Sequence, residues 1–324
     1  MNVLLVQGLL LAFALVVILM RPYLGVLRWI GLGKHVRDVE IDSHSHKEGT
    51  PTMGGLLLIL VCLVLTFLLG IFDASTYAPL AALAGVGVLG AADDYLNARR
   101  GEGISARQKL LWQTVVAIVA AVYLQRHYDF DAFRVPFIGE VHVNPVVWIF
   151  LAAFAIIAAS NGVNITDGLD GLAAGTLIFS YIAFVIIALL NVPNQTNLAI
   201  LSTIIIGALL GFLWFNVHPA QVFMGDSGSL SFGAALAVTA LISGQLLILP
   251  IIGIIFVVEA GSVLVQIIAV KTIGRRVFRF TPIHYQFELD GWDEEKVTLR
   301  FWIVAALASM LGVVFFLSSL HLLS

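Results

Sequence analysis

The chain has 324 residues, of which 60% are hydrophobic and 11% are charged, and its formal net charge is −3. A soluble domain carries about a quarter of its residues as charged side chains, so this chain cannot cover a water-facing surface. The composition excludes a soluble globular protein and indicates an integral membrane protein. The single cysteine, Cys62, excludes an intramolecular disulfide framework and a multi-cysteine zinc site, and we interpret it as a small buried hydrophobic residue.

Ten apolar segments are candidates for transmembrane helices, because a spanning helix needs about 20 mostly apolar residues. The first of them has no basic stretch and no A-x-A-like cleavage site before Arg21, so we interpret it as a retained helix rather than a signal peptide. The alternating pattern typical of a β-barrel is absent from the sequence. The ten segments are 3–20, 53–72, 77–95, 110–125, 145–161, 172–190, 198–215, 230–247, 249–271 and 301–320.

These segments predict an all-α integral membrane protein with about ten transmembrane helices, and residues 1–324 are expected to form a single polytopic domain. Basic residues are distributed very unevenly between the two sides of that arrangement. Each loop is numbered by the segment that it follows. Of the 17 Lys and Arg residues, 15 belong to odd-numbered loops, and Arg126 and Arg134 belong to even-numbered ones. Cytoplasmic loops carry the excess of basic residues, so we expect the odd-numbered loops in the cytoplasm and both termini outside.

Acidic residues gather at the helix ends that this orientation places in the cytoplasm. A single Asp before a helix could act as a cap, but an adjacent pair at the end of a helix meets an unfavourable helix dipole. Carboxylates with no basic neighbour in the sequence repel one another unless a cation lies among them. Mg²⁺ prefers oxygen ligands and typically uses one or two carboxylates together with substrate phosphates. The sequence therefore predicts a magnesium–phosphate site formed by Asp93 and Asp94 at the end of the third segment, Asp167 and Asp170 opening the sixth, and Asp226 leading into the eighth.

Other polar residues near these carboxylates are suited to a phosphorylated ligand. Lys47 and Lys109 can pair with phosphates as point charges, although each could instead be a cytoplasmic anchor. Phe223 could stack on a base, although an isolated aromatic residue is more often a packing residue. Amide donors and acceptors that suit a base or a sugar are offered by Asn161, Asn164 and Asn216.

The loop after the ninth segment is the most basic one and contains His284, which follows Pro282. A histidine among arginines that faces a carboxylate cluster is a candidate phosphate contact. Glu259, inside the ninth segment, is the deep membrane carboxylate of the sequence. An intramembrane acid indicates function by default, but an interhelical hydrogen bond is the simpler interpretation of this residue.

Four segments of the sequence resemble, in chain order, the signature segments of the polyprenyl-phosphate N-acetylhexosamine-1-phosphate transferases. They read DDYLNARRGEGISARQKL at 93–110, NGVNITDGLDGLAAG at 161–175, FNVHPAQVFMGDSGSL at 215–230 and PIHYQFELDGW at 282–292. A fifth segment, GTPTMGG at 49–55, and the final loop are similar to the branch of the family that acts in peptidoglycan synthesis.

The resemblance implies a fold with ten transmembrane helices and outward termini, in the bacterial inner membrane with the active site on the cytoplasmic face. It implies a magnesium-dependent enzyme that transfers phospho-N-acetylmuramoyl-pentapeptide from UDP to undecaprenyl phosphate and gives lipid I and UMP. It also implies a homodimer in contact with membrane lipid, and no nucleic-acid partner is expected.

The resemblance also implies roles for individual residues. Asp93 and Asp94 match the catalytic acidic pair, Asp226 matches the magnesium ligand, and His284 keeps the first position of the final-loop motif. The acidic pair could share the metal with Asp226. The residues expected to bind substrate are Lys47, Thr52, Lys109, Asn161, Asn164, Asp167, Asp170, Asn216, Phe223 and Gln266.

The sequence departs from the family's pattern at two places. Tyr285 and Gln286 stand where the family commonly has two further histidines, and Asn97 stands where Lys is common. Both departures remove basic groups that could contact a pyrophosphate.

Several alternatives remain open at the level of sequence. Asp93 or Asp94 could deprotonate the lipid phosphate, orient it or bind the metal, and a covalent aspartyl-phosphate route is an alternative to direct attack. A sister transferase that uses UDP-N-acetylglucosamine is the nearest rival function. A secondary transporter is the rival from another class, although its site would lie near the bilayer midplane rather than at helix ends.

Overall fold

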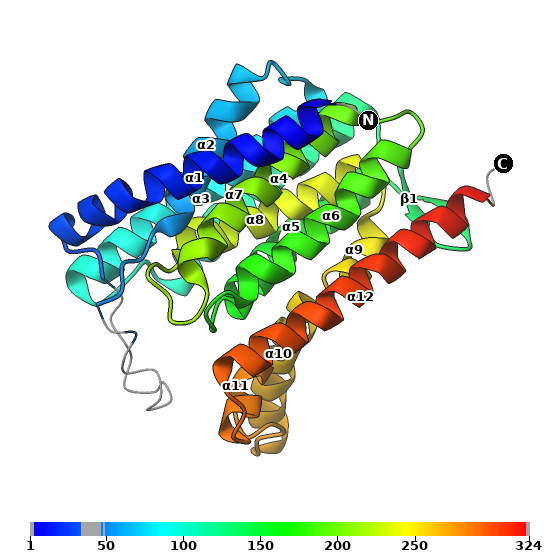
Figure 1. Cartoon of the computed structure of the whole chain (residues 1–324). Helices are drawn as coiled ribbons and strands as arrows, with labels where there is room; N and C mark the ends of the chain where they lie inside the picture. Colours follow the sequence, from blue (N-terminus) through cyan, green and yellow to red (C-terminus); the bar gives the residue numbers. More distant parts are fainter. Residues whose placement is uncertain (1–2, 34–46, 48, 322–324) are drawn as a thin grey trace.

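The computed structural model describes residues 3–33, 47 and 49–321. Most of them are helical, and the long helices run side by side as a bundle (Figure 1). The helices are α1 Val3–Ile30, α2 Gly54–Leu68, α3 Ala74–Arg100, α4 Ala106–Tyr128, α5 Pro145–Thr166, α6 Leu172–Leu190, α7 Thr196–Asn216, α8 Gly225–Ile242, α9 Leu249–Ile252, α10 Ile254–Ile273, α11 Ile283–Leu289 and α12 Glu294–His321. The short 3₁₀-helix η2 is Leu246–Ile248, and the strands are β1 Ala132–Val135 and β2 Gly139–His142.

All ten predicted segments contain helix, and the class of a helical membrane protein is confirmed. Among the described residues, eight helices are long and apolar enough to cross a membrane. The other two are α2, with 15 residues, and α4, which is the more polar one. A count of ten spanning helices therefore stays a prediction.

Two features of the fold differ from the sequence prediction. Residues 132–142 form an antiparallel hairpin in a stretch expected to be a loop, so the chain is not entirely α-helical. Arg134 lies opposite Glu140 across the hairpin, with Nε 3.1 Å from the carboxylate. The predicted ninth helix is broken at Gly253 into α9 and α10, because Pro250 opens the short α9 and Gly253 leaves helical geometry at its end.

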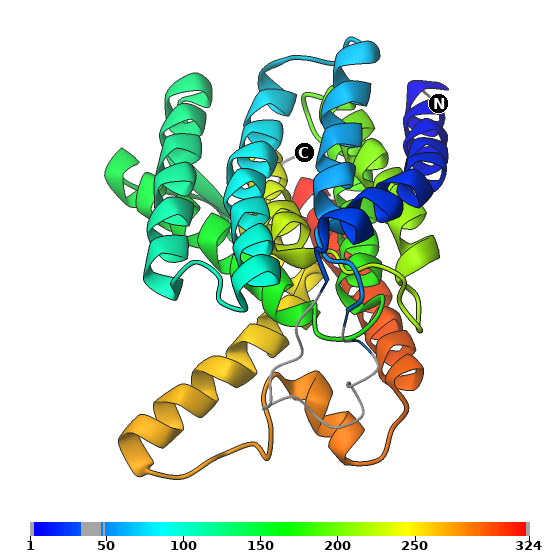
Figure 2. The same ribbon diagram turned by 90° about the vertical axis from the view of Figure 1, so that its left-hand side faces the viewer.

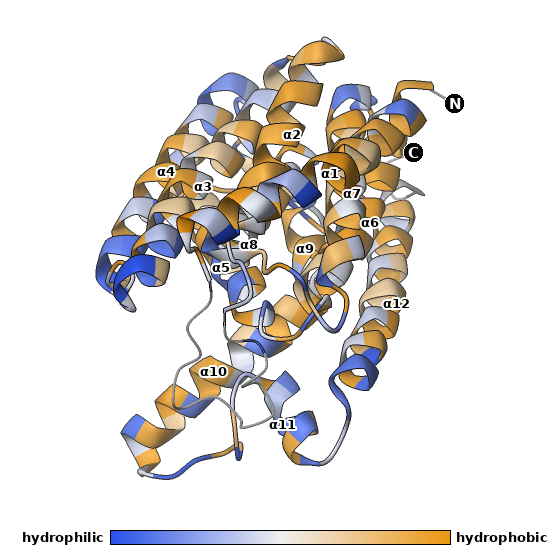
Figure 3. Ribbon diagram, turned by 60° about the vertical axis from the view of Figure 1, so that its left-hand side comes forward, coloured by the Kyte–Doolittle hydropathy of each residue, from blue (hydrophilic) through white to orange (hydrophobic). Residues whose placement is uncertain are grey.

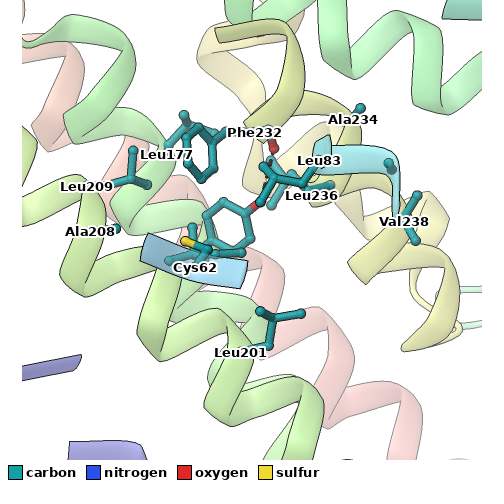
Figure 4. Close-up of a cluster of buried hydrophobic side chains, with 14 of the residues drawn as sticks. Cys62, Leu83, Leu177, Leu201, Ala208, Leu209, Phe232, Ala234, Leu236 and Val238 are labelled. Carbon is teal, nitrogen blue, oxygen red and sulfur yellow. Dashed lines mark hydrogen bonds between the residues drawn. The ribbon is translucent and has the colours of Figure 1, made fainter. Parts of the chain in front are cut away.

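The centre of the bundle is formed by α7 and α8, which are the most deeply buried of the long helices. The helix α8 packs against α3 on one side and α5 on another. Buried side chains from several helices meet there, and Cys62 lies among them as the sequence predicts (Figure 4). The Tyr181 hydroxyl donates to the carbonyl oxygen of Phe232 at 2.9 Å, so a polar group in this core is hydrogen-bonded.

The helices α10 and α11 project beyond the bundle at one end, and the first residues of α1 and the last of α12 lie at the other (Figure 2). Hydrophilic residues gather where α3 and α4 meet and along the segment that leads from α10 to α12 (Figure 3). These two hydrophilic regions lie at the same end of the bundle, which we call the polar end. The orientation in the membrane stays a prediction, and Lys34 and Arg37, two of the basic residues behind it, lie outside the described residues.

A topology reporter tests that orientation. A reporter inserted at Glu102, between α3 and α4, is expected to be cytoplasmic, because the basic residues of the sequence concentrate at that end. A reporter inserted at Asp131, before β1, is expected to lie outside. The opposite pattern would place the acidic residues on the outer face.

Candidate active site

Three carboxylates from two helices meet at the polar end of the bundle. Asp93 and Asp94 lie on α3, and Asp226 lies in the first turn of α8. Each offers an oxygen atom, and these atoms all lie within 4.8 Å of one another. A Cβ built on Gly90 would lie 2.3 Å from the carbonyl oxygen of Asp226, so α3 and α8 approach this closely because position 90 has no side chain. The structure thus brings these three predicted residues together, and their role in a metal or catalytic site stays a prediction.

Asp94 joins the two helices. Its carboxylate accepts the backbone N–H groups of Asp226 at 2.9 Å and Ser227 at 3.0 Å. The first amides of a helix have no partner within the helix and favour negative charge, so Asp94 caps α8 from a different helix. Asp94 is buried and held by these two bonds, and Asp93 is likewise buried and accepts the Ile104 amide at 2.5 Å.

Lys109, near the start of α4, bridges the other two carboxylates. Its Nζ lies 2.6 Å from Asp93 and 2.7 Å from Asp226. Asn164 on α5 donates to the second oxygen of Asp226 at 2.8 Å. The side chain of Lys109 is 26% exposed and that of Asp226 is 21% exposed, so this part of the cluster is open to solvent. Four helices thus supply one acidic centre with a lysine at its accessible side.

These contacts correct two statements made from the sequence. Asp93 and Asp94 do not end their helix, because α3 continues to Arg100. The carboxylates also have a basic partner, since folding brings Lys109 to Asp226 across 117 residues of sequence. Charge repulsion inside the cluster is therefore partly compensated by the protein itself.

Asp170 belongs to a second charged cluster with Lys47, His218 and Glu294. Lys47 Nζ lies 3.1 Å from Asp170 and 2.7 Å from Glu294, and His218 Nδ1 lies 3.1 Å from Asp170. Burial on its own would raise the pKa of Asp170. The charge of Lys47 and the Ala220 amide, 3.0 Å away, outweigh burial and hold that pKa below its usual value. Asp170 therefore has a cation, Lys47, as its direct partner in the fold.

The segment between α5 and α6 carries Asp167 and Asp170. We expected both to open the sixth helix, but α5 continues to Thr166, so Asp167 is the C-cap of α5. The helix α6 begins after Gly171, which has a φ of +76° in the left-handed region that favours glycine. Residues 167–171 are thus a short α5–α6 loop with defined ends.

Other predicted substrate-binding residues have their polar atoms engaged in the protein. Asn216 accepts from the Gly171 amide at 3.0 Å and donates to the Val222 carbonyl at 2.9 Å. Asn161 donates to Gln113 at 2.6 Å. The Gln266 side chain forms hydrogen bonds with the backbone of Val277 and Phe278. The Thr52 amide donates to the Leu32 carbonyl. The Phe223 amide donates to the Pro51 carbonyl, and the Phe223 carbonyl accepts the Gly54 amide. Their binding of a substrate stays a prediction.

His284 on α11 is fully buried, and its Nδ1 lies 3.1 Å from a carboxylate oxygen of Glu259 on α10, which is equally buried. A Cβ on Gly168 would lie 2.3 Å from His284 Nε2, so the other side of the ring faces the α5–α6 loop. The two residues that the sequence singled out separately therefore lie next to each other, although their facing atoms do not reach hydrogen-bond geometry. Glu294 and His218 were not predicted as site residues, because both make their contacts with segments that are distant in the sequence.

The fold is that of a helical membrane protein, and one end of its helix bundle carries three carboxylates placed closely enough that they could hold a metal ion. Residues 76–244 match the model of glycosyl transferase family 4, and the chain belongs to that family. Residues 47–59 match signature 1 of the phospho-N-acetylmuramoyl-pentapeptide-transferases. The chain is thus an enzyme of a transferase family, which excludes the secondary transporter considered from the sequence.

Relatives named phospho-N-acetylmuramoyl-pentapeptide-transferase match the chain over nearly its whole length. One from a Geobacillus species is 40% identical over 95% of this chain and 96% of the relative. One from Anoxybacillus flavithermus is 39% identical over 94% of this chain and 95% of the relative. One from Chloroflexus aggregans is 43% identical over 87% of this chain and 81% of the relative.

Proposed function

We propose that the protein transfers phospho-N-acetylmuramoyl-pentapeptide from UDP to undecaprenyl phosphate, in a magnesium-dependent reaction that gives lipid I and UMP. The observation that carries the proposal is the acidic centre of Asp93, Asp94 and Asp226 with Lys109 at its open side. The names of the relatives and the signature at residues 47–59 support the donor sugar. The enzyme acts in the bacterial inner membrane, with this centre facing the cytoplasm, and a homodimer is part of the proposal.

The carboxylates fit a magnesium ion by the chemistry of their donors. They offer hard oxygen ligands from two packed helices, α3 and α8, and Asp226 is the member with access to solvent. Asp226 would be the principal ligand, with Asp93 or Asp94 as a second. When bound, magnesium supplies charge neutralisation on the phosphate oxygens during phosphoryl transfer.

The protein's own groups can position both substrates. The nucleophile is a phosphate oxygen of the lipid carrier, and a phosphomonoester has a second pKa of about 6, so it needs little deprotonation near neutral pH. Asp93 then acts mainly by orienting that phosphate, and Asp94 by holding α8 in place. Lys109, once released from a carboxylate, can pair with a phosphate as a point charge. A site at the end of a membrane helix bundle can be reached by one substrate from the cytosol and by the other from the bilayer.

The nucleoside and the sugar are proposed to bind at the α5–α6 loop. Asp167 and Asp170 lie on that loop, and Asn164 connects it to Asp226 through α5. Phe223 lies on the segment that leads into α8 and can stack on the base. The other residues proposed to line this part of the site are Lys47, Thr52, Asn161, Asn216 and Gln266.

His284→Ala is expected to lower kcat about a hundredfold, which is about 2.7 kcal/mol of barrier. The change leaves the Glu259 carboxylate buried without its partner and removes the ring that faces the α5–α6 loop. Gln286→His, at a half-buried position two residues further along the same helix, is the control and should change kcat by less than about twofold. Steady-state assays at saturating substrates and magnesium measure both. A larger effect of the control than of His284→Ala would mean that the wrong residue of α11 has been assigned.

Purified protein tests the donor specificity directly. Incubated with undecaprenyl phosphate and magnesium, it should release UMP from UDP-N-acetylmuramoyl-pentapeptide and not from UDP-N-acetylglucosamine. Release from UDP-N-acetylglucosamine alone would identify the sister activity instead.

A further inference from the structure

The helix α12 contacts the α5–α6 loop through three side chains spaced four residues apart. Residues at this spacing lie on one face of a helix, one turn above the other. Glu294 accepts the Asp170 amide at 2.6 Å, Thr298 donates to the Asp170 carbonyl at 3.3 Å, and Trp302 donates to the Gly171 carbonyl at 3.2 Å. Three successive turns of α12 therefore bind two adjacent residues of the loop.

These bonds are made where the loop backbone needs partners from outside. The α5–α6 loop interrupts the ladder of helical hydrogen bonds between Thr166 and Leu172, and Asp170 is buried. Buried backbone groups in a membrane protein must be paired within the protein, because lipid offers no replacement. The face of α12 supplies these partners, so it stabilises one conformation of the loop over others.

Packing holds the same face against α6. The indole of Trp302 lies over Gly175, where a Cβ would be 2.1 Å from the ring, and it also approaches Gly171. The absence of side chains at these two positions lets the indole reach the loop carbonyl. The two helices run side by side in the bundle, so the contact extends beyond these residues (Figure 1).

Glu294 also ties the loop to two other segments. The oxygen that accepts the Asp170 amide lies 2.7 Å from Lys47 Nζ, and its second oxygen lies 3.5 Å from His218 Nδ1. Lys47 precedes α2, and His218 follows α7. The buried Glu294 carboxylate thus contacts three segments: the α5–α6 loop, the segment before α2 and the segment after α7. Each of them carries predicted substrate-binding residues.

We propose that Glu294, Thr298 and Trp302 are positioning residues that set the α5–α6 loop for binding the nucleoside part of the UDP-sugar. They act through Asp170 and Gly171 and do not touch the substrate. The inference rests on the proposed function, since that function is what assigns the nucleoside to this loop. It adds a role for the α12 face, which lies outside the sequence segments that carry the acidic centre.

Three variants test the proposal. Glu294→Gln and Thr298→Val keep the shape of the side chain, whereas Trp302→Phe also makes the ring smaller. Glu294→Gln removes the charge, Thr298→Val removes the hydroxyl, and Trp302→Phe removes the indole N–H. Glu294→Gln should raise KM for the UDP-sugar about tenfold, which is about 1.4 kcal/mol. The other two should raise it about threefold each, the size of one neutral hydrogen bond.

In all three variants, kcat and KM for undecaprenyl phosphate should stay within about twofold of wild type, because the acidic centre is on other helices. The matched control is Glu295→Gln, which makes the same charge change at the adjacent, mostly exposed glutamate and should leave KM for the UDP-sugar unchanged. Combining Thr298→Val with Trp302→Phe should give less than the product of the single effects, because both act on the same short loop.

The outcomes separate this proposal from the proposed function. If wild-type protein releases no UMP from the UDP-sugar, the function is wrong. If wild type is active and the three variants keep wild-type KM for the UDP-sugar, the positioning role is wrong and the function stands. A fall of kcat with an equal change of KM for both substrates would also overturn the role, since it would mean general destabilisation.

Discussion

Asp226→Asn is expected to lower turnover at least about a thousandfold, which corresponds to roughly 4 kcal/mol of barrier. The substitution keeps the shape of the side chain but removes the charge of the solvent-accessible carboxylate in the acidic centre. Lys109 also loses one of its two carboxylate partners and keeps Asp93. The measurement is UMP release by protein that inserts into the membrane and purifies like wild type.

The control for this variant is Asp131→Asn, which makes the same change at an exposed aspartate next to the hairpin. It should retain wild-type turnover. If Asp226→Asn kept activity within about tenfold of wild type, Asp226 would not be the principal metal ligand.

Gly90→Ala is expected to reduce turnover about a hundredfold or more, because a displacement of about 1 Å in a catalytic group has effects of this size. The new methyl group would lie 2.3 Å from the carbonyl oxygen of Asp226 and 2.4 Å from the Ser227 amide nitrogen. Both are backbone atoms at the start of α8 and cannot rotate away. The helices must separate, which moves Asp94 away from the α8 amides that it caps, and overpacking of this kind also costs about 1–3 kcal/mol of stability.

Gly85→Ala is the matched control in the same helix. A Cβ there would meet Val116 at 3.4 Å, which is ordinary contact, and alanine favours the helix by about 1 kcal/mol over glycine. Turnover and melting temperature of Gly85→Ala should equal or exceed those of wild type. Equal behaviour of the two variants would show that the close approach of α3 and α8 does not control the site.

The sequence predicts the fold to the extent that hydrophobicity determines it. Long apolar runs specify helices in lipid, and each of the ten predicted segments contains one. Hydrophobicity does not locate the end of a helix that polar residues continue. The predicted segments therefore end at residues 95 and 161, whereas α3 continues to Arg100 and α5 to Thr166. It also does not reveal a local break such as Gly253, because the residues on both sides of it are apolar.

The sequence points to the acidic residues of the candidate site but not to the residues that contact them. Asp93, Asp94 and Asp226 stand out because carboxylates are rare in an apolar chain. The pairing of Lys109 with Asp226 and of Lys47 with Glu294 joins residues 117 and 247 positions apart, which no local pattern encodes. The contacts of α12 with the α5–α6 loop were not predicted for the same reason, since Thr298 and Trp302 resemble ordinary helix residues in the sequence.

Metal binding by the acidic centre tests the central claim most directly, and it can be measured without turnover. Purified wild-type protein should bind Mn²⁺, detected by electron paramagnetic resonance, at a site from which Mg²⁺ displaces it. Asp226→Asn should abolish this binding, and Asp131→Asn should leave it unchanged. Equal Mn²⁺ affinity in wild type and Asp226→Asn would contradict the assignment of Asp93, Asp94 and Asp226 as the metal-dependent transfer site.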